Sequence, residues 1–68
     1  MEEDTPNYTY ILLYYNKAIQ SDSIRVINTN IRIITEYTNI FPDVTDLSSS
    51  LIYYLVERKE QLRMMEIK

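Results

Sequence analysis

The chain has 68 residues, a formal net charge of −3, and no cysteine, histidine or glycine. A chain this short forms at most one domain, without disulfides, thiolate metal sites or histidine ligands. Without glycine, phosphate-binding loops and tight β-hairpins are disfavoured, and the negative charge argues against bulk electrostatic binding of nucleic acid. The acidic start and the lack of a long apolar run predict an intracellular protein, cytoplasmic or nuclear, with no membrane association.

The first predicted helix covers residues 5–20. Thr5 is suited to cap its N-terminus, and Pro6 is suited to its first position. Apolar residues at helical spacing share one face, namely Tyr8, Ile11, Leu12, Tyr15, Ala18 and Ile19. Residues 21–23, Ser-Asp-Ser, then predict a break and a new helix cap.

Residues 24–37, IRVINTNIRIITEY, suit either a β-hairpin or a single helix. Isoleucine and valine favour strands, but the apolar–polar alternation fails after Val26, and the only available turn, residues 28–30, lacks glycine. A helix explains every position, because it gives two apolar faces: Ile24, Ile27, Ile31, Ile34, Thr38 and Phe41 on one, and Val26, Ile33 and Ile40 on the other. We therefore predict a helix over residues 23–41 that contacts either both other helices of its own chain or one of them and another chain.

The third predicted helix covers residues 44–67. Pro42 ends the preceding helix, and Asp43, Thr45 or Asp46 is suited to cap the new one. Its apolar face consists of Val44, Leu47, Leu51, Tyr54, Leu55, Leu62 and Met65. The expected fold is therefore all-α: a three-helix up-down-up bundle, or a helical hairpin with a long C-terminal helix, completed by another chain.

Arg58 interrupts the apolar face of the third predicted helix, between Leu55 and Leu62. One interpretation is that the core has ended there and the side chain extends to water. The alternative is that Arg58 pairs with a carboxylate, either Glu36 or an acidic residue of another subunit, and so helps to select a partner.

Two runs are apolar on every side of their helices: YILLYY at residues 10–15 and LIYYLV at residues 51–56. Either the tyrosine rings cover the edge of the core while their hydroxyls reach water, or another chain buries these runs. The second alternative predicts a protein interface formed by Tyr10, Leu13, Tyr14, Ile52, Tyr53 and Val56, with Arg58 adding selectivity.

Arg25 and Arg32 lie one heptad apart and predict a polar or nucleic-acid contact, in which Lys59 and Arg63 can join them. Catalysis has little support, because the serine run at residues 48–50 has no histidine to activate it. We predict no catalytic, cofactor or metal residues and no small-molecule substrate. The expected function is that of a non-enzymatic assembly or adaptor subunit, such as a viral accessory protein, which binds itself or a larger complex. The alternative is a small dimeric nucleic-acid-binding regulator.

Overall fold

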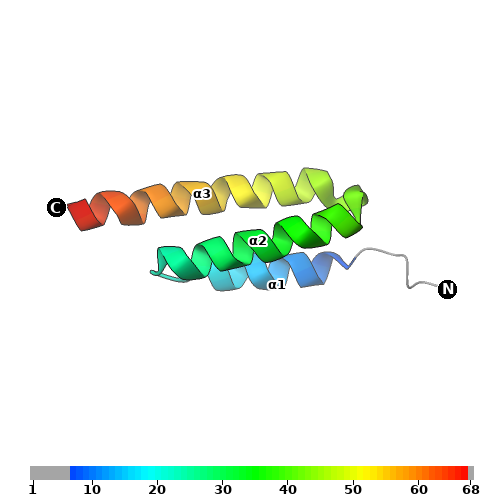
Figure 1. The fold of residues 1–68 in the computed structure, drawn as a ribbon, viewed down its shortest axis with the longest axis horizontal. Helices are drawn as coiled ribbons and strands as arrows, with labels where there is room; N and C mark the ends of the chain where they lie inside the picture. Colours follow the sequence, from blue (N-terminus) through cyan, green and yellow to red (C-terminus); the bar gives the residue numbers. More distant parts are fainter. Residues whose placement is uncertain (1–6, 68) are drawn as a thin grey trace.

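The computed structural model describes residues 7–67, with side chains to residue 65. Within this part of the chain it contains the helices α1 (Tyr8–Ile19), α2 (Ile24–Ile40) and α3 (Thr45–Ile67), a 3-10 turn η1 (Pro42–Val44), and no strand. The all-α prediction is thus confirmed, and residues 24–37 form a helix rather than a hairpin. The chain reverses direction at each connection, so α2 runs antiparallel to both α1 and α3, and all three helices pack together (Figure 1).

Short polar side chains determine where α1 and α2 begin. Asn7 caps α1, because its Oδ1 accepts a hydrogen bond from the Tyr10 backbone N–H at 3.2 Å. The predicted cap, Thr5, lies outside the described residues. Ser23 caps α2 as the sequence indicated, its Oγ accepting from the Val26 N–H at 3.3 Å. The polar residues between α1 and α2 therefore act as the predicted break and restart.

The connection between α2 and α3 differs from the prediction, because the turn η1 leads directly into α3. Pro42 starts this turn, where its fixed φ and missing N–H are tolerated. The Thr45 hydroxyl donates to the Pro42 carbonyl at 2.6 Å instead of accepting a capping hydrogen bond. No described residue has a positive φ, so neither connection requires the glycine that the chain lacks.

The core lies along the common axis of the three helices. Its buried apolar residues are Ile11 and Ala18 from α1, Ile27 and Ile34 from α2, Val44 from η1, and Leu51, Leu55 and Leu62 from α3. All of them belong to the apolar faces that helical spacing predicted. Burying a side chain of this size contributes about 1.5–3 kcal/mol, so this single cluster provides most of the stabilisation of the bundle.

Some residues that the same spacing placed in the core are exposed instead: Tyr8, Leu12, Tyr54 and Met65. Helix lengths explain the exposure of Met65. At about 1.5 Å per residue, α3 is roughly 35 Å long and α1 roughly 18 Å, and the C-terminal end of α3 extends beyond the other two helices (Figure 1). Tyr54 is the other residue of α3 that was predicted to be buried and is exposed. It lies at the edge of the core face, beside a groove described below.

Two polar side chains are buried in this core with hydrogen bonds. The Ser48 hydroxyl, on α3, lies 2.7 Å from the Thr38 hydroxyl, on α2, and Thr38 also donates to the Ile34 carbonyl at 2.8 Å. Asn30 donates to the Val26 carbonyl at 2.8 Å. These bonds offset the cost of removing the polar groups from water. The Thr38–Ser48 pair also joins α2 to α3 at a defined register.

Candidate protein-interaction surface

Large apolar side chains are exposed along all three helices in the described part of the chain. They are Tyr8, Tyr10, Leu12 and Leu13 on α1, Val26 and Ile40 on α2, and Tyr53, Tyr54, Val56, Met64 and Met65 on α3. Single exposed apolar residues are ordinary, but contiguous groups mark interaction sites. The question is therefore which of these side chains lie together.

One group is a row of aromatic rings across α1 and α2. The ring centroids of Tyr14 and Tyr10 are 4.9 Å apart, those of Tyr10 and Tyr37 are 4.6 Å apart, and those of Tyr37 and Phe41 are 4.9 Å apart. Lys17 extends the row, with its Nζ 5.3 Å from the centre of the Tyr14 ring. Distances of this size are typical of attractive ring contacts. Tyr10 and Tyr14, both predicted as interface residues, therefore already pack within their own chain.

The packing of this row also changes the acidity of one phenol. The pKa of Tyr10 is raised above its ordinary value, first by partial removal from water and then by the neighbouring Tyr14.

The predicted interface residue Leu13 lies outside the row and is exposed. The second apolar face of α2 remains largely open, since Val26 and Ile40 are exposed and Ile33 is half-buried.

A second group of exposed apolar residues lies on α3. The rings of Tyr53 and Tyr54 meet edge to face, with centroids 5.8 Å apart, and both side chains are exposed. The predicted interface residue Val56 is exposed as well, whereas Ile52 is half-buried against the core. Among the described residues, no aromatic contact joins Tyr53 and Tyr54 to the α1–α2 row. Tyr53 and Tyr54 thus form a ring pair of their own on α3.

The neighbouring carboxylate perturbs the first of these tyrosines. Glu57 raises the pKa of the Tyr53 phenol, first as a hydrogen-bond acceptor and then through its negative charge. Residues four apart on a helix are neighbours on its surface, so this effect requires no tertiary contact. Glu57 is thus the helix-surface neighbour of Tyr53, four residues further along α3.

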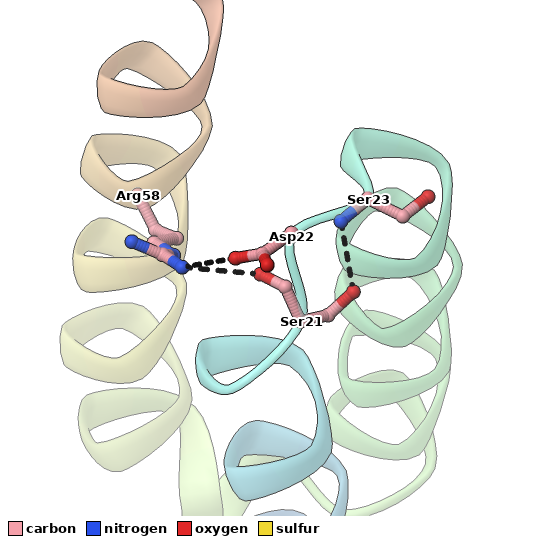
Figure 2. Close-up of polar contacts among 4 residues, drawn as sticks. All are labelled: Ser21, Asp22, Ser23 and Arg58. Atoms are coloured by element: carbon pink, nitrogen blue, oxygen red, sulfur yellow. Dashed lines mark hydrogen bonds and ion pairs between the residues drawn. The ribbon is translucent and has the colours of Figure 1, made fainter. Parts of the chain in front are cut away.

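Arg58 pairs within its own chain, with a residue of the α1–α2 connection. Its Nη2 lies 2.9 Å from Asp22 Oδ1 and donates to the Ser21 carbonyl at 3.4 Å, as Figure 2 shows. Ser21 is itself held by its Oγ, which accepts from the Ser23 N–H at 3.0 Å. Within the described residues the carboxylate that pairs with Arg58 is Asp22 of the α1–α2 connection and not Glu36. Arg58 therefore fastens α3 to that connection. Pairing of Arg58 with an acidic residue of another subunit stays a prediction.

Two hollows border the exposed tyrosines of α3. A groove of about 300 Å³ between α1 and α3 is lined by Tyr15, Ile19, Tyr54, Glu57, Arg58 and Gln61. A shallower hollow of about 280 Å³ lies beside Ser49, Ser50, Tyr53 and Tyr54. Tyr54 borders both. Tyr54 has the spacing of a core residue, so its exposure is not evident from the sequence alone. It follows from the position of α1, which leaves the Tyr54 ring uncovered.

Lys59 of α3 reaches the face of α2 that carries Arg25 and Arg32, and a polar or nucleic-acid contact by these residues stays a prediction. Lys59 Nζ donates to Asn28 Oδ1 at 2.7 Å, and Asn28 lies on the same face of α2 as Arg25 and Arg32, at intervals of three and four residues. Both arginines are exposed. Arg63 is partly engaged, because its Nη1 lies 3.5 Å from Glu60. We refer to Arg25, Arg32 and Lys59 as the basic face.

The described part of the chain contains no group of three side chains able to hold a metal ion. None of its helices combines the length and the apolar character needed to cross a membrane. The serine run at residues 48–50 includes the buried Ser48, whose hydroxyl is engaged with Thr38. Comparisons with protein-family models, with curated proteins and with solved structures gave no match.

Proposed function

We propose that this chain is a non-enzymatic helical subunit, an assembly or adaptor protein that acts by binding another protein chain, either itself or a larger complex. The observation that carries the proposal is the exposure of large apolar side chains on α3, where Met64 is 66% exposed, Met65 64%, Tyr53 60% and Tyr54 52%. Tyrosine and methionine are both enriched at protein interfaces. Their concentration on one helix supports a binding role for α3.

The small size of the core supports the same proposal. A domain of about 60 residues buries only about 60% of the surface of its unfolded chain, and the described core has one apolar cluster. A partner that binds only the folded form adds stability by mass action. Covering the exposed tyrosines and methionines would add about 25 cal/mol for each Å² of apolar surface removed from water.

A pair of charged substitutions on α3 tests this role. Tyr53→Glu with Met64→Glu changes two exposed positions and should abolish association while circular dichroism still reports a helical chain. The matched control, Thr35→Glu with Asn39→Glu, changes exposed polar positions of α2 and should leave association unchanged. Association is followed by native size-exclusion chromatography of the purified chain and of cell extracts that contain it. Equal elution of both variants and the wild type would contradict the proposal.

A second candidate function is binding to nucleic acid through the basic face. The Lys59–Asn28 hydrogen bond favours it, because that bond brings a cation of α3 beside Arg25 and Arg32 of α2. The net charge of −3 opposes it. This candidate predicts salt-dependent binding to DNA or RNA that Arg25→Glu with Arg32→Glu removes without unfolding the chain. No binding at low salt would eliminate it.

A further inference from the structure

The exposed face of α3 carries its side chains in a symmetric order. Two tyrosines, Tyr53 and Tyr54, stand at one end and two methionines, Met64 and Met65, at the other. Glu57 and Gln61 lie between them, and the intervals from 54 to 57, 61 and 64 are three, four and three residues. Such intervals keep side chains on one face of a helix. We call these six residues the α3 face.

We propose that two copies of this chain associate through the α3 face as an antiparallel, two-fold symmetric pair. This inference rests on the proposed assembly function and names its partner, a second copy. In a two-fold interface the same patch is used twice, so that residue i meets residue j and j meets i. The midpoint of the α3 face is residue 59. An antiparallel pair about that point places the tyrosines of each copy against the methionines of the other, and Glu57 against Gln61.

The chemistry of the opposing residues is complementary in this arrangement. Methionine sulfur makes favourable contacts with aromatic ring edges, worth about 0.3–1.5 kcal/mol each. The amide of Gln61 can donate a hydrogen bond to the carboxylate of Glu57. A parallel pair would instead place Glu57 opposite Glu57, which like-charge repulsion disfavours. Both the apolar ends and the polar centre of the α3 face therefore favour the antiparallel orientation.

The shape of the surface suits a second helix. The hollow of about 280 Å³ beside Tyr53 and Tyr54 is bordered by Ser49 and Ser50, whose small side chains leave room for an unbranched methionine. The groove of about 300 Å³ continues this surface toward α1, and its lining includes Glu57 and Gln61. The methionine end of α3 projects beyond α1 and α2, so a second copy reaches it without meeting the rest of the bundle (Figure 1).

The association of the two copies should be reversible. One helix face from each copy covers less than the area of about 1,200–2,000 Å² that is typical of stable interfaces. We therefore expect a monomer–dimer equilibrium that shifts with protein concentration, visible by sedimentation velocity. Tyr54→Ala should shift this equilibrium toward the monomer, whereas Leu13→Ala, which shortens an exposed leucine on α1, should not.

Cysteine cross-linking tests the orientation directly, because the natural chain contains no cysteine. Chains with Glu57→Cys are mixed with isotope-labelled chains with Gln61→Cys, oxidised, and analysed by mass spectrometry. The antiparallel pair predicts an excess of the mixed disulfide over both self-pairs. The excess is about tenfold relative to random mixing if the antiparallel orientation is favoured by about 1.4 kcal/mol. Asn16→Cys mixed with Gln20→Cys is the control and should give the random ratio. These two exposed positions have the same spacing, in the last turn and at the C-cap of α1.

An excess of self-pairs, a random ratio for the α3 cysteines, or a wild-type monomer at every concentration would overturn the antiparallel pair. These results are distinguishable from failure of the assembly function. The wild-type chain can stay monomeric when purified and still enter a larger complex in extracts. If Tyr53→Glu with Met64→Glu abolishes that complex, the assembly function holds with a different partner.

Discussion

Arg58 of α3 forms an ion pair with Asp22, a residue 36 positions earlier in the chain, with 2.9 Å between Nη2 and Oδ1. The two partners differ in environment, because the Arg58 side chain is 26% exposed and that of Asp22 is 89% exposed. The Nε atom of Arg58 is buried without a hydrogen-bond partner. The pair thus fixes the position of the α1–α2 connection, while its contribution to stability is limited by exposure at one end and an unsatisfied donor at the other.

Removing the charge of Asp22 should therefore have a small effect. Asp22→Asn is expected to change the free energy of unfolding by less than about 1 kcal/mol, as for other solvent-exposed ion pairs. Arg58→Met, which keeps an unbranched apolar stem, should leave stability unchanged or increased, because it removes the buried Nε. Urea unfolding followed by circular dichroism measures both. A loss above about 2 kcal/mol for Arg58→Met would show that the ion pair stabilises the bundle strongly.

Two adjacent residues of α3, Leu55 and Val56, should differ in how much their truncation to alanine destabilises the bundle. Leu55 is fully buried, so Leu55→Ala should cost about 2–5 kcal/mol from lost apolar burial and the resulting cavity. Val56 is exposed, so Val56→Ala should cost less than about 1 kcal/mol. The free energy of unfolding of a small domain is only about 5–15 kcal/mol in total. Leu55→Ala should therefore lower the thermal midpoint markedly. Similar midpoints for the two variants would contradict the assigned register of α3.

The hydroxyl pair between α2 and α3 predicts a non-additive result. Thr38→Val leaves the buried Ser48 without its partner and should cost about 1–3 kcal/mol. Adding Ser48→Ala removes the orphaned hydroxyl and should recover part of that loss. A double-mutant cycle in urea isolates the coupling between the two residues. Additive effects would mean that the two hydroxyls do not interact in solution.

The titration of Tyr53 reports on its neighbour Glu57. Glu57 raises the pKa of the phenol, so Glu57→Gln should bring that pKa back toward its ordinary value of 10.0. Because the raised pKa belongs to the folded state, its stabilising contribution is present below the unfolded pKa and is lost as pH rises through the folded one. Residue-resolved NMR of the tyrosine rings during alkaline titration measures the shift of Tyr53 among the seven tyrosines, with Glu60→Gln as the control. An unchanged titration in Glu57→Gln would contradict the contact.

Helical spacing alone predicted most of the fold. The repeat of Ile24, Ile27, Ile31 and Ile34 identified α2 against the strand propensity of isoleucine, because only a helix gives these positions one face. The Ser23 cap followed from the local chemistry of a serine before an apolar run. These features depend on neighbours in sequence, which is why sequence reasoning reached them.

The features that sequence reasoning missed depend on the relative lengths and positions of helices. Tyr54 and Met65 have core spacing, yet both are exposed. Tyr54 lies at the edge of the core face beside α1, and Met65 lies on the part of α3 that extends beyond the short α1. Asp22 pairs with Arg58 because the packing of the helices brings the α1–α2 connection beside α3, a proximity that the sequence does not reveal. The predicted interface residues Tyr10 and Tyr14 pack in the α1–α2 aromatic row, a contact between helices that spacing within one helix does not reveal.

The most direct test of the assembly role is light scattering on a size-exclusion column, across a range of loading concentrations, with circular dichroism on the same peak. The wild-type chain should be helical, with a mass that rises above the 8.2 kDa of one chain as concentration increases. Tyr53→Glu with Met64→Glu should remain helical and elute with the mass of one chain. A wild-type chain that stays at that mass at every concentration, and that elutes from cell extracts at the same position as the variant, would contradict the account.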